Sequence, residues 1–90
     1  MDKTHRKKAA ALKYELNYDA PIVSAAGMGH IADKIVQEAK KNEVPVVYNK
    51  ELADLLTNVD VGSSIPEELY NAVAEVIAYI MDVDKLANGR

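Results

Sequence analysis

Apolar residues recur with a helical period in the C-terminal third of the chain. Between residues 66 and 83 they fall at every third or fourth position, which predicts one long helix. Ser64 stands three residues before Glu67, with Pro66 in the first turn, and both features are typical of a helix start. Its apolar positions form two neighbouring stripes, the first being Leu69, Val73, Val76 and Ile80 and the second Tyr70, Ala74, Ile77 and Met81. One stripe is enough to pack a helix on a sheet, so the second stripe must contact more of the domain or a ligand peptide.

Shorter stretches carry weaker patterns of the same kinds. Small and β-branched apolar residues predict two strands near the start, and a third apolar run is entered through Pro45. Helical spacing predicts one helix before this run and another after it, where Asn49 can cap the first turn. The predicted elements are strands at 9–15, 21–25 and 44–48 and helices at 30–41 and 50–57.

A strand, a helix and a strand in succession predict a parallel pair with a right-handed crossover. We therefore expect an α/β fold, with a small, mostly three-stranded mixed sheet that contains this βαβ unit and is covered by three helices. The residues expected to face inward are Ile31, Ile35 and Ala39 in the helix at 30–41 and Leu52, Leu55 and Leu56 in the helix at 50–57.

The composition indicates one small domain with an uneven charge. Ninety residues, 49% of them apolar, suit a single folded unit. The net charge is −3, yet residues 1–8 alone are strongly basic, so the rest of the chain is acidic and does not favour nucleic-acid binding. We divide the chain into a basic flexible arm at 1–8, a domain at 9–83 and a flexible tail at 84–90. The arm could bind an anionic partner, although a solvated terminus is the simpler interpretation.

Several residue types and segments are missing from this sequence. The chain has no cysteine, which excludes disulfides, thiol catalysis and cysteine metal ligands. No apolar run approaches the roughly 20 residues that span a bilayer, and no signal-peptide stretch follows the basic start. We therefore expect a cytoplasmic protein that reaches a membrane only through a partner.

No group of residues forms a convincing catalytic or metal site. Gly27 and Gly29 precede a predicted helix, but without a third glycine or a Gly-Lys-Ser/Thr the simpler interpretation is a turn. His5 and His30 are far apart, and Thr4 and His5 are neighbours in an arm that cannot hold a nucleophile against its base. The sequence therefore predicts no enzyme activity, no cofactor and no metal.

Seven stretches together resemble a known protein family. They follow the family's order from residue 9 to about residue 82, and the segment from Ile65 to Tyr70 is the most specific. The stretches are 9–14, 20–23, 27–29, 31–35, 44–47, 52–53 and 61–76. With them the chain resembles the cytoplasmic C-terminal domain of the type III secretion export switch, which is the flagellar FlhB family and its injectisome counterparts.

The resemblance implies a function and a site. In the family this domain is a docking platform that recognises export substrates and takes part in the switch between early and late ones. Carried over by position, the docking patch falls on Ala20, Pro21, Ala74 and Ile77, flanked by Tyr70 and Met81. Ala74 and Ile77 also belong to the second stripe, so periodicity and resemblance indicate the same surface, although that stripe could also simply be core. The implied partners are export substrates with short apolar motifs and other export components at the inner face of the membrane.

The chain departs from the family at the self-cleavage motif. Full-length members cleave themselves at Asn-Pro-Thr-His, and an ungapped alignment puts Thr4, His5, Arg6 and Lys7 at these positions. The asparagine side chain attacks its own backbone in that reaction, so we expect no autocleavage here. The family's N-terminal membrane domain and the strand before the cleavage turn are also missing from this sequence.

We therefore expect a non-enzymatic module that stands in for the cleaved C-terminal half of the export gate protein. The N-terminal fragment of that gate protein is a further expected partner, because it would carry the missing strand. Two other interpretations stay open at this point. The chain could be a regulatory competitor of the full-length gate protein, or an unrelated adaptor that binds an anionic partner through its basic arm.

Overall fold

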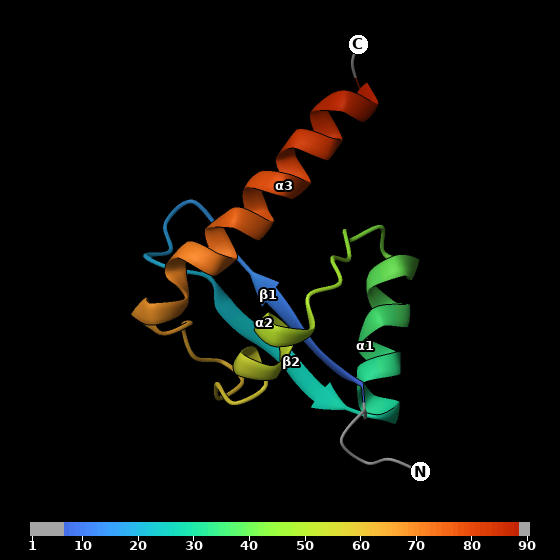
Figure 1. Cartoon of the computed structure of the whole chain (residues 1–90), viewed down its shortest axis with the longest axis vertical. Coiled ribbons are helices and arrows are strands. Elements are labelled where there is room, and N and C mark those ends of the chain that lie inside the picture. The colour runs from blue at the N-terminus through green and yellow to red at the C-terminus, as the bar shows by residue number, and fades with distance from the viewer. Residues whose placement is uncertain (1–6, 89–90) are drawn as a thin grey trace.

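The computed structural model describes residues 7–88, with side chains through residue 82. Two strands and a helix come first, followed by a short helix, a 3-10 turn and a long C-terminal helix (Figure 1). The elements are β1 (Lys8–Lys13), β2 (Ile22–Met28), α1 (His30–Lys41), α2 (Lys50–Leu56), η2 (Glu67–Leu69) and α3 (Tyr70–Asn88). The second half of α3 extends away from the body of the domain (Figure 1).

The sheet consists of β1 and β2, which pair in antiparallel orientation. The register runs from Lys8 opposite Met28 to Lys13 opposite Ile22. An irregularity falls between Ala11 and Leu12, whose partners are Ala25 and Val23, so Ser24 is left without an opposite residue. The Ser24 hydroxyl donates to the carbonyl of Ala11 at 3.2 Å, which gives the bulge its own hydrogen bond.

The second edge of β2 is paired with the segment that leads into the long helix. The Val23 N–H donates to the carbonyl of Ser63 at 3.0 Å, and the Gly62 N–H donates to the Val23 carbonyl at 2.7 Å. Two residues further on, the Ile65 N–H donates to the carbonyl of Pro21 at 3.0 Å. Gly62 has a φ of 94°, a conformation that glycine adopts at no steric cost. These bonds fix the start of α3 against β2.

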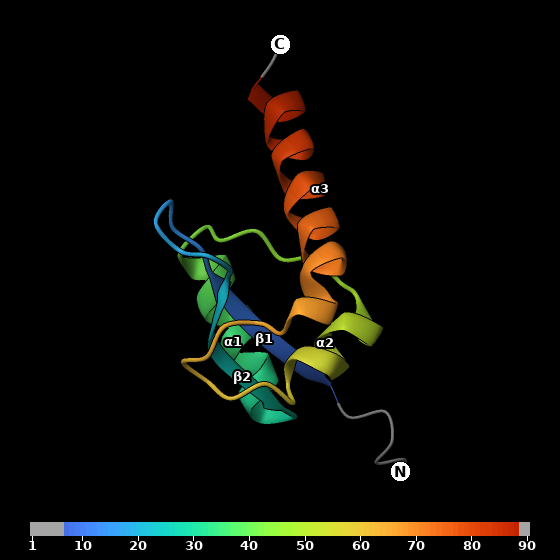
Figure 2. The same cartoon turned by 90° about the vertical axis from the view of Figure 1, so that its left-hand side faces the viewer.

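Most of the hydrophobic core lies on one face of the sheet. Val23 and Val73 are fully buried at its centre. The cluster joins β2, α2 and the start of α3, and it consists of Ala20, Val23, Leu52, Leu56, Ile65, Leu69 and Val73. In Figure 2 the strands lie between α1 and α2, so α1 covers the opposite face.

Small residues line the sheet face that α1 covers. Side chains alternate along a strand, and the pairs Ala9–Gly27 and Ala11–Ala25 share a face. At Gly27 a Cβ atom would lie 2.9 Å from the Cβ of Ile31 in α1 and closer still to its Cγ2. Because these positions carry almost no side chain, α1 packs close to the sheet and buries Ala32 to 1% exposure.

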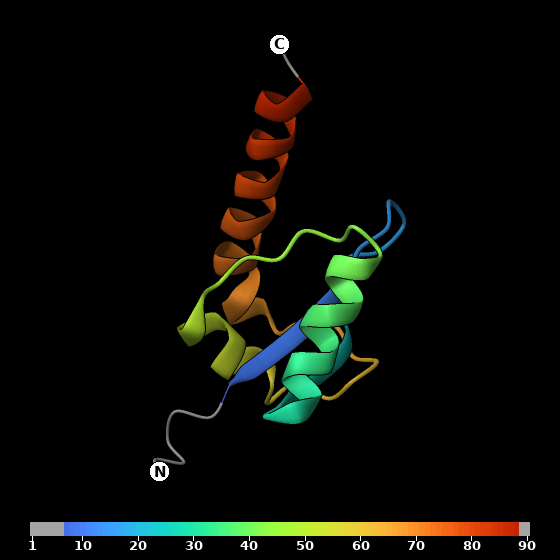
Figure 3. The same ribbon diagram turned by 90° about the vertical axis from the view of Figure 1, so that its right-hand side faces the viewer.

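The predicted third strand is the main error in the expected fold. Within residues 7–88 the sheet has two strands, both antiparallel, so the parallel βαβ pair is wrong. Residues 44–48 form no regular element and run from α1 to α2 on the β1 side of the sheet (Figure 3). Within the described residues they form no ladder with β1, and Pro45 has no N–H to donate. The apolar run therefore corresponds to a segment that forms no backbone hydrogen-bond ladder with a strand.

Two helix ends also differ from the prediction. Ser64 forms an isolated bridge with Ile22 instead of capping a helix, and Pro66 stands before a 3-10 turn with no side-chain cap. At the other end α3 reaches Asn88, so residues 84–88 are helical where a flexible tail was expected. Of the basic arm, residues 1–6 lie outside the described part of the chain, and Lys8 already belongs to β1.

The two shorter helices form where they were expected. The helix α1 spans His30–Lys41, and the side chain of Asn49 accepts a hydrogen bond from the Leu52 N–H at 3.0 Å at the start of α2. Their buried faces are rotated slightly from the predicted ones, since Ile31 is 58% and Leu55 46% exposed. Among the described residues no helix is long and apolar enough to cross a membrane.

We predict that Gly27→Ala destabilises the domain through Ile31. The new methyl group would overlap the β-branched side chain of Ile31, and such overpacking costs about 1–3 kcal/mol. The measurement is urea unfolding followed by circular dichroism. Adding Ile31→Ala to the variant should restore at least half of the loss, whereas purely additive losses would show that the contact with α1 is not the cause.

Candidate functional site

The two apolar stripes of the long helix have different surroundings. In the first stripe Leu69 and Val73 are buried in the core at 8% and 1% exposure. In the second stripe Tyr70 is 42% and Met81 65% exposed, and Ala74 is also exposed. The body of the domain therefore buries the start of the first stripe, leaves Val76 and Ile80 half-buried, and leaves most of the second stripe uncovered. Ile77 is intermediate, because it is half-buried and packs against the edge of the core.

A second wall faces this stripe and comes from the segment between β1 and β2. A turn closed by the Tyr18 N–H on the Glu15 carbonyl at 2.9 Å brings the chain back toward β2. Ala20 is 5% exposed and Pro21 half-buried, and the Pro21 carbonyl is held by Ile65. This wall is therefore fixed to the base of α3 by the core and by backbone hydrogen bonds.

The two walls enclose an open groove of about 370 Å³. Its lining residues are Tyr14, Asp19, Ala20, Pro21, Ile65, Tyr70, Val73, Ala74, Ile77, Ala78 and Met81. Most of these side chains are apolar, and the polar groups are one carboxylate and two tyrosine hydroxyls. Such a surface suits apolar side chains of a ligand more than a highly charged small molecule.

All six residues expected at the docking site line this one groove. The structure brings Ala20 and Pro21 from one wall opposite Ala74 and Ile77 from the other, with Tyr70 and Met81 along the helix. Ala20 is at the same time a core residue, so it forms the floor of the groove and offers little surface of its own.

Sequence reasoning missed five lining residues. Ala78 follows Ala74 by four positions, so helical spacing could have added it to the second stripe. Val73 and Ile65 are core residues that show one side to the groove. Tyr14 and Asp19 stand in the segment between the strands, where no periodicity marks which side chains face inward.

The other candidate residues do not gather into a site. Thr4 and His5 lie outside the described residues. Gly29 precedes α1 with a φ of 64°, which supports a turn, and His30 is exposed at the helix start. Within residues 7–88, no three histidine, cysteine or acidic side chains are grouped so that they could hold a metal ion.

Comparison with known proteins gives a consistent result over almost the whole chain. The sequence profile of the FlhB HrpN YscU SpaS family matches residues 4–80. YlqH of Bacillus subtilis is 42% identical over 85 residues, which are 93% of this chain and 91% of that protein. The flagellar biosynthetic protein FlhB of Aquifex aeolicus is 51% identical over 75 residues, which are 81% of this chain but 21% of that protein. The chain thus spans about a fifth of the length of FlhB.

Solved structures show the same likeness. The cytoplasmic domain of FlhB from Shewanella putrefaciens superposes with a TM-score of 0.85 at 31% identity, covering 92% of this chain and 71% of that one. The PscU C-terminal domain superposes with a TM-score of 0.78 at 25% identity, covering 82% of this chain and 96% of that one. The family profile, which matches residues 4–80, includes every groove residue except Met81.

We predict that a new charge destabilises the domain far more at one of two neighbouring residues of α3 than at the other. Val73→Asp would bury an unpaired carboxylate in the core and should cost about 4 kcal/mol or more, enough to unfold a domain of this size. Ala74→Asp points into the open groove and should cost about 1 kcal/mol, mostly from lower helix propensity. Thermal unfolding followed by circular dichroism compares them. Equal loss of structure in both variants would show that the second stripe is core.

Proposed function

The chain belongs to the FlhB HrpN YscU SpaS family, and we propose that it is a docking module that recognises substrates of a bacterial type III protein export apparatus. Its relatives include flagellar FlhB proteins of several bacteria, and its fold is that of their cytoplasmic domain. The proposed substrates are export proteins that carry short apolar motifs. In this proposal the chain stands in for the C-terminal half of the export gate protein.

The observation that carries this proposal is the uncovered second stripe beside a fixed wall. Tyr70, Ala74 and Met81 remain exposed although the neighbouring stripe is buried at its start. An apolar groove lies between these exposed residues and Pro21. An apolar motif could place one or two side chains in this groove. Burying one such side chain is worth roughly 1.5–3 kcal/mol before the entropic costs of binding. Docking would therefore be weak and reversible, as a substrate that must move on requires.

We also propose that the module acts by binding and not by catalysis. The polar groups that line the groove are the carboxylate of Asp19 and the hydroxyls of Tyr14 and Tyr70. They do not form a nucleophile with an adjacent base, which covalent catalysis needs. The residues that align with the family's cleavage motif are Thr4 to Lys7, and they lack the asparagine whose side chain performs the self-cleavage.

A second contact of the proposed module is a strand added to the free edge of β1. In an antiparallel pair the hydrogen-bonded positions alternate. The Gly29 N–H donates to the Lys7 carbonyl at 2.8 Å, so Lys8 and Ala10 turn their backbone groups away from β2. Within residues 7–88 no other strand pairs with this edge, and the unladdered segment 44–48 runs on the same side. An edge of this kind is a template for an incoming strand.

We propose that the N-terminal fragment of the gate protein supplies this strand. In the family the missing strand precedes the cleavage turn, so the fragment left after cleavage would end in it. Capture of that strand would hold the chain at the inner face of the membrane. It would also give the chain the completed sheet of the natural C-terminal half.

Export in living cells tests the docking function. In a strain whose FlhB ends at its cleavage site, the unchanged chain should restore secretion of flagellar proteins into the medium. Ala74→Asp should abolish this rescue, because it places a charge in the groove. Asn71→Asp is the matched control, because it adds the same charge on the polar side of the same helix and should rescue fully.

Two results would contradict the docking function. One is rescue by Ala74→Asp as good as that by the unchanged chain, which would remove the groove from the mechanism. The other is failure of the unchanged chain to rescue combined with reduced secretion in a strain with intact FlhB, which would make the chain a competitor of the gate protein.

Amide hydrogen exchange tests the added strand. A peptide that spans the segment before the FlhB cleavage site should slow exchange at the amides of Lys8, Ala10 and Leu12. The matched control is the same peptide with N-methylated backbone nitrogens at alternate positions, which cannot complete a ladder. If neither peptide changes exchange in β1, the chain does not capture that strand.

A further inference from the structure

One carboxylate, that of Asp19, lines the groove among the described residues. Asp19 is exposed on the wall formed by the segment between the strands. Among the residues that the structure describes, its side chain makes no hydrogen bond and no ion pair. Among the side chains described through residue 82, no lysine or arginine lines the groove. Within that part of the chain, the negative charge therefore stands without a cation beside an apolar surface.

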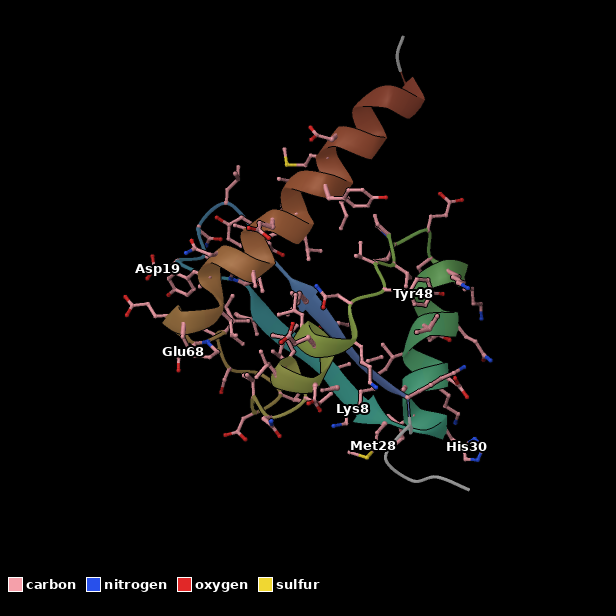
Figure 4. The ribbon with its side chains drawn as sticks, viewed as in Figure 1. Lys8, Asp19, Met28, His30, Tyr48 and Glu68 are labelled. Atoms are coloured by element: carbon pink, nitrogen blue, oxygen red, sulfur yellow. The ribbon has the colours of Figure 1, made fainter. Side chains whose placement is uncertain are left out.

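The described lysines nearest to the groove in sequence are already engaged elsewhere. Lys13 lies 3.6 Å from the carboxylate of Glu15, and Lys8 forms an ion pair with Asp54 of α2. The first turn before α3 adds Glu67 and Glu68, which are exposed. In Figure 4, Asp19 and Glu68 lie on the same side of the molecule at the N-terminal end of α3. The potential at this end of the groove is therefore negative.

Two tyrosine rings complete the surroundings. Tyr14 and Tyr70 both line the groove and are 55% and 42% exposed. A lysine or arginine can lay its aliphatic stem along apolar surface while its cation reaches a carboxylate. A cation over a tyrosine face is also attracted by the ring. The groove thus offers an apolar lining, a carboxylate and two tyrosine rings. These groups together suit a ligand in which a basic residue stands beside an apolar one.

We propose that the groove prefers segments in which a lysine or arginine neighbours the apolar anchor, and that Asp19 reads this charge. The proposal rests on the docking function above and adds a rule for which apolar segments are chosen. Asp19 acts as a specificity residue, whereas Ala74 and Ile77 provide the contact that every bound segment shares. Acidic residues beside the anchor would be disfavoured by the same carboxylate.

The expected discrimination is modest because Asp19 is exposed. Ion pairs at exposed sites are worth about 0.2–1 kcal/mol, which corresponds to a preference of about 1.4- to fivefold for a basic over a neutral neighbour. Salt should reduce this preference, since mobile ions screen exposed charges over roughly 10 Å at 0.1 M. Binding of the neutral segment should change little with salt.

A titration with three synthetic peptides tests this proposal. Each is a 12-residue serine–glycine peptide with two leucines, and a lysine, a glutamine or a glutamate stands beside the second leucine. Binding is followed by NMR through the amide signals of Ala74 and Ile77, which detects affinities in the millimolar range. The chain should bind the lysine peptide about 1.4- to fivefold more tightly than the glutamine peptide, and it should bind the glutamate peptide least tightly.

Variants at position 19 test whether the Asp19 carboxylate causes the preference for the lysine peptide. Asp19→Asn should make the lysine and glutamine peptides equal, and Asp19→Lys should reverse the order in favour of glutamate. Asp60→Asn is the matched control, because it removes an exposed acid that does not line the groove and should leave the preference unchanged.

The outcomes separate this proposal from the docking function. Equal binding of all three peptides, or a lysine preference that survives in Asp19→Asn, overturns the charge rule while apolar docking stands. Absence of shifts at Ala74 and Ile77 with every peptide overturns apolar docking in the groove, and the charge rule with it.

Discussion

The backbone pairing between β2 and residues 62–65 positions almost everything else in this domain. Val23 is buried, and both its N–H and its carbonyl are bonded to this segment. Buried backbone groups must find hydrogen-bond partners, because leaving one unpaired costs about 1–3 kcal/mol. The pairing meets that requirement and at the same time sets where α3 begins. The face of α3 that packs on the core, and hence the face that remains open, follows from this one constraint.

The two faces of the β1–β2 hairpin have different roles: one packs against α1, and the other carries the core beside which the groove forms. On one side small residues at Ala9, Ala11, Ala25 and Gly27 let α1 lie close to the strands. On the other side larger residues build the core under α2 and the start of α3. The groove forms beyond the edge of that core, where Ile77 is still half-buried and Met81 is not. A ligand there would contact side chains that the core holds in place from behind.

Local patterns revealed more about the helices than about the sheet. The helical periodicity predicted most of α3 and its second apolar face, because both depend on residues three and four positions apart. The pairing of residues 44–48 could not be read in the same way, since an apolar run fits a strand only if a neighbouring strand exists. Ser64 shows the same limit: its spacing from Glu67 favours a cap, yet the long-range pairing with Ile22 prevails. At the groove, Ala74 and Ile77 were predictable, whereas Asp19 and Tyr14 depend on how the segment between the strands folds back.

The distance along the chain between the two walls of the groove has a consequence for biosynthesis. One wall comes from residues 14–21 and the other from residues 65–81. The bonds that join them, from Ile65 to Pro21 and from Ser63 and Gly62 to Val23, close a loop of some forty residues. The hairpin and α1 can form while the later part of the chain is still being translated, because their contacts are local. The groove itself cannot exist until α3 has emerged from the ribosome, so an unfinished chain would have no groove in which to dock a substrate.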